Sequence, residues 1–357
     1  MASNLQIKDL LSKDEIVSVF LVKNVQLHEA KDGKKYLSLV LSDASGEMES
    51  WIWHNAESHA EKIVKNKAYK VQGKLNLFQG KKQFIIQQID QMPDDSYDVE
   101  DFLMKSTAHP EEMYKKLLLI VERLDDVYIK ELLLSILHDH EIMRRLKTWQ
   151  AGKTIHHAYR SGLLEHILSC TELAVTLSPH YKVNGNYVVA GCILHDLCKI
   201  YELTDGVNVD YTEEGKLVGH LVKGLEIVDK YSYKIPNFPY QLKLHLKHIL
   251  LSHHGDYEYG SPKIPSTSEA YLVHLIDLMD SKMNSLEMVK RNDQASGHWS
   301  QYIKHLDRIV YKAELPYFKE WLPDPKEMTP PSRELKTPKK ELKQNLGKLL
   351  EDWKSED

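Results

Sequence analysis

The chain has 357 residues, of which 42% are hydrophobic and 28% charged, so it can hold two domains with a sizeable core. Its formal net charge of −5 excludes a global basic field, and any nucleic-acid binding must come from local patches. The 19 histidines are an excess, and neutral imidazole is the commonest metal ligand in proteins.

Residues 1–92 are predicted to form a small β domain. Strand patterns begin at Ile16 and at Tyr36, where Leu37, Leu39 and Leu41 share one face. Further along come a returning strand over 47–53, a polar helix over 55–65 capped by Asn55, and strands over 68–78 and 84–89. Three strands, a helix and two strands are the order of a five-stranded OB barrel. The stretch 37–53 resembles the OB domains that bind single-stranded nucleic acid.

Two loops of this barrel carry paired lysines next to a glycine turn. OB barrels bind oligonucleotides on the strand 2–3 face and with these two loops. The lysines that we expect to follow a phosphate backbone are Lys34, Lys35, Lys81 and Lys82. The aromatic residues that could stack bases are Tyr36, Trp51, Trp53, Phe78 and Phe84. The alternative is that the lysines are solvated hairpin tips and the aromatic rings belong to the core.

The remainder of the chain divides into three segments. Residues 93–109 are acidic and read as a linker, and residues 110–321 are predicted to be almost wholly helical, with Pro110 in a first turn. Later helices are expected over 216–231, 240–251, 268–285 and 300–311. Residues 322–357 form a charged, partly flexible tail with a short helix over 341–353. The predicted fold class is therefore multi-domain α+β, an OB barrel followed by an all-α bundle.

The N-terminus and the cysteines indicate a cytoplasmic protein. No charged start precedes an apolar run, and no apolar stretch is long enough to span a bilayer, so no membrane partner is expected. Cys170, Cys192 and Cys198 form no Cys-x-x-Cys pair, which argues against a zinc ribbon. They are expected to be small buried thiols in a reducing compartment.

The helical region is organised around the adjacent pair His195-Asp196. The apolar, proline-free run before the pair predicts a buried helix, and buried polar groups at its end need partners. Other potential metal ligands lie in helical contexts on either side: His166, His220, His253, His254 and Asp277. A single histidine on an apolar helix is usually a core residue, but a set in this order is hard to explain that way.

This order resembles the HD-domain family of metal-dependent phosphohydrolases. The resemblance implies one metal on His166, His195, Asp196 and Asp277. It implies a second on His220 and His253, with His254 as an uncertain neighbour and Asp196 as the bridge. Such ligands suit Mn²⁺, Fe²⁺, Co²⁺, Ni²⁺ or Zn²⁺. Two cations about 3.5–4 Å apart can clamp the attacking and leaving oxygens of a phosphodiester, which removes the need for a serine or cysteine nucleophile.

Lys199 and Asp280 have expected supporting roles beside these ligands. Lys199 matches the lysine of the family's His-Asp-x-x-Lys pattern, so with Asp196 it is a candidate catalytic residue that offsets charge on the phosphate. The alternative for Lys199 is a helix C-terminal lysine that caps carbonyls. Asp280 follows Asp277 on the same helical face and is expected to orient a ligand histidine.

The stretch 156–166, with the barrel before it and 268–283 after it, resembles the YhaM family of bacterial 3′→5′ exoribonucleases. The resemblance spans about residues 14–320. It implies metal-dependent removal of nucleotides from the 3′ end of single-stranded RNA, typically with Mn²⁺ and often with activity on single-stranded DNA. His156, His157 and Arg160 are then candidates for substrate phosphate contacts, with a structural role as the alternative for each.

Two other functions compete with the exonuclease. HD sites serve many phosphate esters, so a nucleotide phosphohydrolase or cyclic-nucleotide phosphodiesterase is the first, although a mononucleotide needs no strand-binding barrel. The second is a nucleic-acid-binding regulator with a structural HD site, against which the complete ligand set argues. The sequence leaves a homo-oligomer open.

Overall fold

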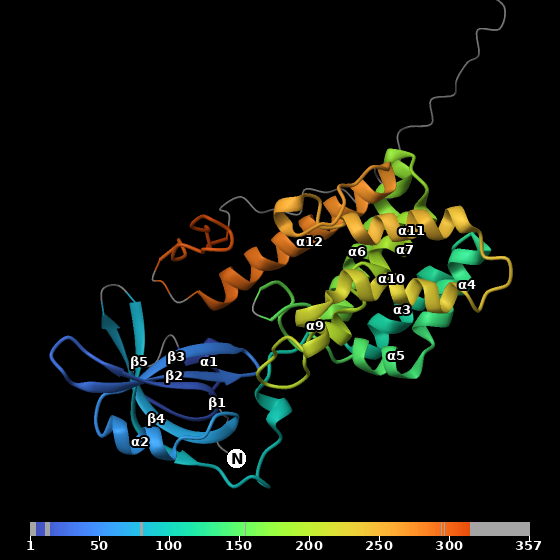
Figure 1. Cartoon of the computed structure of the whole chain (residues 1–357). Coiled ribbons are helices and arrows are strands. Elements are labelled where there is room, and N and C mark those ends of the chain that lie inside the picture. The colour runs from blue at the N-terminus through green and yellow to red at the C-terminus, as the bar shows by residue number, and fades with distance from the viewer. Residues whose placement is uncertain are drawn as a thin grey trace, which may run out of the picture. The chain divides into compact units, whose positions relative to one another are not determined.

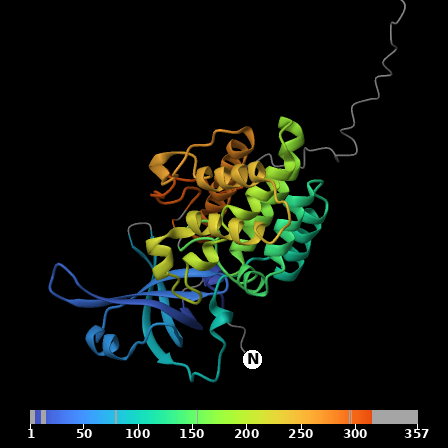
Figure 2. The same cartoon turned by 45° about the vertical axis from the view of Figure 1, so that its right-hand side comes forward.

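The computed structural model describes residues 5–10, 15–78, 81–153, 155–293, 295 and 297–314, without the side chains of 77–78 and 81–82. Met1–Lys312 forms one compact unit, which holds a β barrel and a helical domain, and Ala313–Asp357 is assigned to a second. Figure 1 labels elements of the first unit, and Figure 2 shows them from another side. The predicted tail, residues 322–357, lies outside the described residues.

The N-terminal strands close into a barrel in the order β1-β2-β3-β5-β4. Neighbouring strands are antiparallel except for β3 and β5, whose parallel pairing closes the barrel. The elements are α1 (Ile7–Leu10), β1 (Glu15–Glu29), β2 (Lys35–Asp43), β3 (Gly46–Ile52), α2 (Ala56–Lys62), β4 (Lys67–Phe78) and β5 (Lys81–Gln91). This arrangement confirms the five-stranded OB barrel that the order of strands and helix predicted.

Alternation along the strands decides which aromatic residues face the barrel interior. Leu37 and Leu39 are buried on β2, and Met48 and Ile52 on β3. Phe84 on β5 is also fully buried in this core, so the expectation that it could stack bases is wrong.

The outer side of the barrel carries Trp51, which is half-buried, and Trp53, which is exposed. Asn55 precedes α2 as predicted, but its backbone is left-handed (φ 51°) and its side chain makes no capping bond. Its carbonyl oxygen instead accepts a bond from the His59 amide.

The acidic segment 93–109 packs on the barrel rather than extending freely. It contains the 3₁₀ turn η1 (Val99–Phe102), and Phe102 and Leu103 are buried with Leu21 and Ala68 of the barrel. The Ser42 hydroxyl donates to the Phe102 carbonyl oxygen at 2.9 Å. Burial of apolar side chains thus fixes the middle of a segment that its charge marked as a linker.

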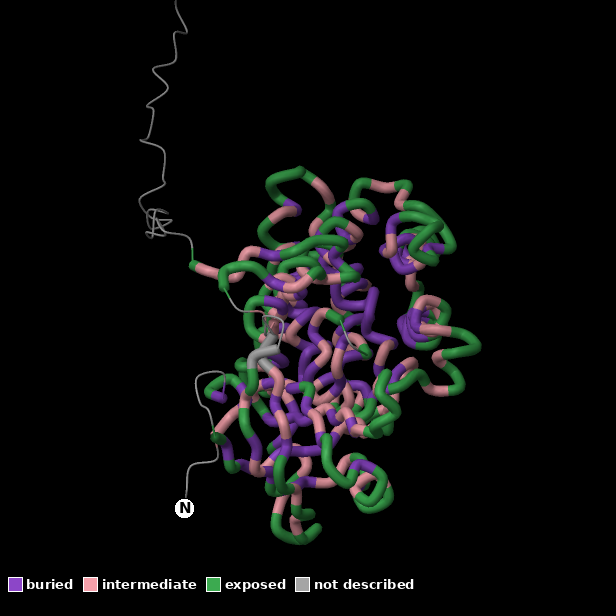
Figure 3. Tube along the Cα trace, turned by 90° about the vertical axis from the view of Figure 1, so that its left-hand side faces the viewer, coloured by how far each residue is buried: buried purple, intermediate pink, exposed green. Residues whose placement is uncertain are grey.

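The helical domain follows. Most of its buried apolar residues form one cluster, and Val289, Leu306 and Val310 form a smaller one; Figure 3 colours the chain by burial. Its elements are α3 (Pro110–Glu122), α4 (Val127–Leu137), α5 (His140–Leu146), α6 (Gly162–Tyr181), α7 (Gly185–Leu194), α8 (Lys199–Glu202), α9 (Glu213–Leu217), α10 (Gly219–Ser232), α11 (Tyr240–Ser252), η2 (Tyr257–Tyr259) and α12 (Ser268–Asn292). None of the helices in the described part of the chain has the length and hydropathy that a bilayer crossing requires.

The predicted helix over 300–311 does not form. The segment turns back on itself through paired residues Trp299–Tyr311 and Ile303–Arg308, with Asp307 in the left-handed region at φ 54°. Its apolar residues Leu306 and Val310 still pack on Val289 of α12. A short apolar run is compatible with either a helix or a hairpin. Here the turn at Asp307 makes the segment a hairpin.

Helix α7 packs closely against two other helices of the domain. A Cβ atom added to Gly191 would lie 2.7 Å from side-chain atoms of both Ile249 on α11 and Val273 on α12. Glycine therefore lets α7 pack directly against two helices that carry other candidate ligands. A bulkier residue here would push those helices apart.

Candidate metal centre

The pair His195-Asp196 lies at the C-terminal end of α7, where the chain turns toward α8. His195 is the residue that closes the helix, and both side chains are buried. The helix before it is buried from Val188 to Leu194. A continuous apolar helix therefore carries two polar side chains into the middle of the domain, where a binding partner must compensate their burial.

A first group of ligand atoms gathers around one oxygen of Asp196. The Nε2 atoms of His166 and His195 lie 3.1 Å apart. Oδ2 of Asp196 is 3.5 Å from the His166 nitrogen, and Oδ1 of Asp277 is 3.4 Å from it. These four side chains offer atoms that all lie within 4.8 Å of one another, as ligands of a single ion would.

A second group faces the other oxygen of Asp196. Oδ1 of this residue lies 3.5 Å from Nε2 of His220 and 3.8 Å from Nε2 of His253. His254 joins these histidines in a second cluster of mutually close ligand atoms. Asp196 thus presents one oxygen to each group, which is the arrangement of a bridging carboxylate.

The ring nitrogens of the second group lack partners within the described residues. Nε2 of His220, Nε2 of His253 and Nδ1 of His254 are buried and make no hydrogen bond to any of them. Each such atom costs roughly 1–3 kcal/mol of desolvation if nothing binds it. Bare nitrogens beside a carboxylate fit a divalent cation, and the chain therefore provides a suitable site for one.

In four candidate ligand histidines, His166, His195, His220 and His253, the Nδ1 atom is held by an acceptor. Nδ1 of His195 and of His253 donate to the carbonyl oxygens of Cys192 and Leu250, in both cases at 2.9 Å. Because a carbonyl only accepts, the proton resides on Nδ1 and leaves Nε2 bare. The same local arrangement, a histidine that closes a buried helix and bonds the carbonyl three residues back, thus occurs twice.

Carboxylates orient His166 and His220 in the same way. Asp280 accepts from Nδ1 of His166 at 2.7 Å, which is the contact that its expected orienting role requires. Glu202 accepts from Nδ1 of His220 at 2.9 Å. Ser169 in turn donates to Asp280.

The electrostatic environment keeps both ligand carboxylates ionised. Burial raises the pKa of Asp196, but Lys199 and His195 outweigh it, and the pKa falls well below its ordinary value. Burial likewise raises the pKa of Asp277, and hydrogen bonds from His166 and His195 reverse the shift. A pair of carboxylates that stays charged in the interior favours a bound cation.

Two histidines of the second group, His253 and His254, are held neutral. Burial lowers the pKa of His253, and burial together with His253 and His220 lowers that of His254 to about 4. Neutral imidazole is the form that binds metals. His166 differs: burial lowers its pKa, the neighbouring Cys170, Asp196 and Asp277 raise it, and the net shift is upward. The field at His166 therefore favours positive charge, whether from a proton or from a cation.

Lys199 is the first residue of α8 and points back to the ligands. Its Nζ lies 2.6 Å from Oδ2 of Asp196, and its side chain is only 14% exposed. This placement differs from the alternative of a helix C-terminal cap, because the residue begins its helix.

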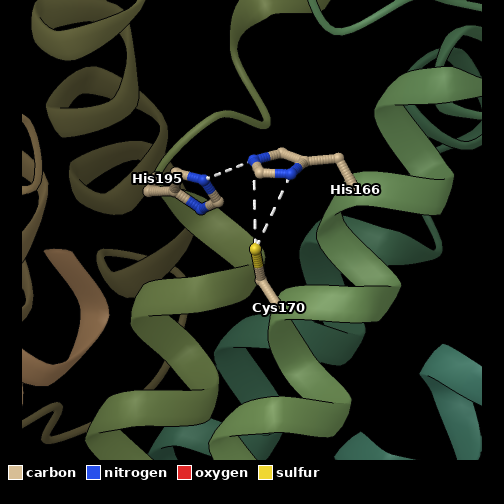
Figure 4. Close-up of side chains that lie close together, drawn as sticks. All are labelled: His166, Cys170 and His195. Atoms are coloured by element: carbon tan, nitrogen blue, oxygen red, sulfur yellow. Dashed lines mark hydrogen bonds between the residues drawn. The ribbon is translucent and has the colours of Figure 1, made fainter. Parts of the chain in front are cut away.

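The cysteines are buried and unpaired. Cys170 lies one turn along α6 from His166, with its sulfur 3.7 Å from Nδ1 of that ring, and His195 approaches from α7 (Figure 4). Burial raises the pKa of the Cys170 thiol to about 11, so it is protonated near neutral pH. A protonated thiol is a poor metal ligand, and the geometry favours the His/Asp set.

The three candidate phosphate contacts of the loop before α6 differ in their surroundings. His156 is half-buried, with its ring centroid 6.0 Å from that of His166, and so faces the centre. His157 is buried and bonds Asp280 and Tyr159 through its two ring nitrogens, so it has no free edge for a phosphate. Arg160 is paired with Glu100 and Asp205, which gives it a structural role.

The barrel candidates include a ladder of rings. Trp53 stacks on Tyr36 with centroids 4.7 Å apart, and Tyr36 stacks on His28 at 5.2 Å. His28 was not anticipated. Its only signal is its place opposite Tyr36 in the β1–β2 register.

The lysines of the first loop are close to acids. Lys34 is 82% exposed beside Asp32, and Lys35 pairs with Glu57. The predicted contacts Phe78, Lys81 and Lys82 have side chains outside the described part of the structure.

Of the residues that orient the candidate ligands, sequence reasoning found Asp280 and missed the others. Glu202 and Ser169 carry no motif, and only the fold brings them to His220 and Asp280. The carbonyl partners could have been found, because a histidine at the end of a helix can bond the carbonyl three residues back.

Comparisons with known proteins agree with both domains. Residues 163–282 match the model of the HD domain family, and residues 21–91 match the model of an OB-fold nucleic acid binding domain. A protein of Oceanobacillus iheyensis named 3′-5′ exoribonuclease YhaM is 34% identical over 310 residues, 86% of this chain and 96% of that protein.

Relatives of the same name occur in Listeria. The protein of Listeria welshimeri is 34% identical over 296 residues, 82% of this chain and 93% of its own length. That of Listeria monocytogenes is 33% identical over the same shares. The chain has an HD domain after an OB barrel, and its sequence identity to these relatives extends over most of both chains. It therefore belongs to the YhaM family of 3′-5′ exoribonucleases.

Proposed function

We propose that this chain removes nucleotides from the 3′ end of single-stranded RNA by metal-dependent hydrolysis, and that single-stranded DNA is a second substrate. The observation that carries the proposal is the pair of ligand groups that share Asp196, each facing one of its oxygens. The family supports the substrate and the direction, because the relatives are named 3′-5′ exoribonucleases.

The ligand roles follow the two groups. His166, His195, Asp196 and Asp277 would hold one divalent cation, and His220, His253 and His254 would hold a second together with Asp196. When bound, such cations supply a nucleophilic hydroxide near neutral pH and offset charge on the phosphodiester. We favour Mn²⁺, and a mixed imidazole and carboxylate set also suits Co²⁺, Fe²⁺, Ni²⁺ or Zn²⁺.

The remaining residues position the substrate. Lys199 contributes a buried positive charge beside Asp196, where a phosphate oxygen would be neutralised. His156, in the loop before α6, lies near the ring of His166 and also lines a cavity. On the barrel, exposed Trp53 offers a ring face for a base, while Lys34 and Lys35 offer charges to the backbone.

A product ladder tests the proposal. The protein, supplemented with Mn²⁺, is incubated with single-stranded RNA labelled at its 5′ end. Progressive shortening from the 3′ end, stopped by a chelator, is the expected result. Intact RNA, internal cuts, or early release of the labelled nucleotide would contradict it, and turnover of free nucleotides instead would favour the phosphohydrolase.

A further inference from the structure

A cavity of about 690 Å³ is lined by residues of the barrel and of the helical domain, none of which is a candidate metal ligand. One of its walls is His156, whose ring centroid lies 6.0 Å from that of the candidate ligand His166. Further walls come from the loops around residues 150 and 208 and from α12. This volume is typical of pockets that enclose a small organic ligand, and a nucleoside is of that size.

One face of α12 connects the cavity to the centre. Ser285, Met288 and Asn292 line the cavity and follow the candidate ligand Asp277 at spacings that keep them on one side of the helix. The rise of about 1.5 Å per residue places Ser285 roughly 12 Å from Asp277 along the axis. A chain held at the centre therefore reaches the cavity within a short distance.

The charged residues that line the cavity are largely neutralised by partners. The ion pairs are Lys23 with Glu47 at 2.5 Å, Lys153 with Asp210 at 2.9 Å, and Asp293 with Lys312 at 2.7 Å. A pocket for phosphate groups would present unpaired cations. This cavity instead suits a neutral part of a nucleotide.

The other lining residues combine apolar surface with free amides. Ile155, Met288 and Val289 supply the apolar wall. The side-chain amides of Gln150 and Asn292 have no hydrogen-bonding partner among the described residues and are half-buried. Apolar surface with amide donors and acceptors is what recognises an unstacked base, through its face and its edge.

We propose that this cavity binds the base of the nucleotide on the 5′ side of the scissile phosphodiester. The proposal rests on the exonuclease function above. In digestion from the 3′ end the body of the strand lies on the 5′ side of the scissile bond. The cavity is also lined by Lys23 and Glu47 of the barrel. An RNA strand bound to the barrel would therefore reach the metal centre through the cavity.

Substitution Met288→Trp, which fills the cavity, tests the proposal, with Met283→Trp as the matched control. Met283 is on the same helix and 61% exposed. Two short RNAs are compared, one normal and one lacking the base at its penultimate nucleotide. The parent and Met283→Trp should show a KM about tenfold higher for the RNA without the base and a similar kcat, since burial of one base accounts for that factor. Met288→Trp should not distinguish the two RNAs.

Equal KM values for both RNAs in the parent, or undiminished discrimination in Met288→Trp, would overturn the proposal. If Met288→Trp does not fold, as judged by thermal unfolding, Asn292→Ala takes its place and should reduce the discrimination. A parent that degrades no RNA contradicts the exonuclease function instead. Titration with adenosine then decides on the cavity: binding that Met288→Trp abolishes and Met283→Trp preserves supports it, and no binding to the parent overturns it.

Discussion

Asp196 is the residue on which the centre depends. Its two oxygens face different groups of histidines, and Lys199 lies against one of them. Because Lys199 and His195 hold its pKa well below the ordinary value, the carboxylate is charged near neutral pH. A buried permanent anion between bare imidazoles is stable only with a compensating cation, from Lys199 alone or with metals.

Substitution Asp196→Ala should lower RNA hydrolysis by several orders of magnitude while the fold survives, since it removes the oxygen that each group shares. Asp256→Ala, at an exposed acid of the same domain, is the control. The measurement is the initial rate at saturating Mn²⁺ together with the bound metal. A rate within a few-fold of the parent would rule out the shared-carboxylate assignment.

Asp280→Asn should weaken metal binding rather than abolish catalysis. Asp280 accepts from Nδ1 of His166, and loss of such an orienting carboxylate typically costs about 10–100-fold in metal affinity. The Mn²⁺ concentration for half-maximal activity should rise by that factor, and excess Mn²⁺ should restore the rate. Glu287→Gln, on the same helix, should change neither. A rate that excess metal does not restore would assign Asp280 a different role.

The ligands could be predicted from the sequence, and most of their supports could not. His166, His195, Asp196 and Asp277 were expected together because their order resembles that of the HD-domain family, and the fold brings them together. Glu202 meets His220 only because α8 lies beside α10, and no periodicity reports that contact. His157 looked like a phosphate contact, whereas its burial and its two bonded nitrogens were invisible before the fold was known.

At the scale of elements, secondary structure could be predicted where one sequence pattern dominated. The alternation of Leu37, Leu39 and Leu41 predicted a strand with a buried face, and the structure confirms it. The sequence over 300–311 was compatible with two different structures. Its apolar spacing fits a helix, but a left-handed residue, Asp307, turns the segment into a hairpin. That outcome depends on packing against α12, which the sequence does not encode locally.

The cap of α5 gives a prediction about stability. Asp139 accepts from the amides of Glu141 and Ile142, and a bond from Tyr231 lowers the pKa of its carboxyl. Asp139→Ala should therefore cost about 1 kcal/mol of unfolding free energy at pH 7. Because the pKa is lower in the folded state, this stabilisation is present above the ordinary value of 3.8 and fades as the pH falls below it. Urea unfolding at pH 7 and pH 3.5 measures it, and a difference that grows at pH 3.5 would contradict the assignment.

At the scale of the molecule, the chain combines a barrel suited to binding a nucleic-acid strand with a helical domain suited to hydrolysing a phosphodiester. The ladder of Trp53, Tyr36 and His28 is on the barrel, whereas every candidate metal ligand comes from the helical domain. The proposed function therefore assigns strand capture and cleavage to different residues, and substitution should separate the two.

Trp53→Ala should weaken binding of single-stranded RNA by about 1–3 kcal/mol, the contribution of one stacked base. The kcat on a short RNA should remain near that of the parent, because Trp53 is not part of the centre. Tyr233→Ala, at an exposed tyrosine of α10's C-terminal end, is the control for loss of a surface ring. Binding is measured by fluorescence anisotropy. Unchanged affinity would move the strand-binding surface away from the ladder.

The most direct test of the two-cation centre is a diffraction experiment on crystals soaked in Mn²⁺, with data collected at the manganese absorption edge. The account predicts two anomalous peaks that flank Asp196. One should lie among His166, His195 and Asp277, and the other near His220 and His253. No peak beside Asp196, or a single peak that leaves the nitrogens of His220 and His253 bare at saturating Mn²⁺, would contradict it.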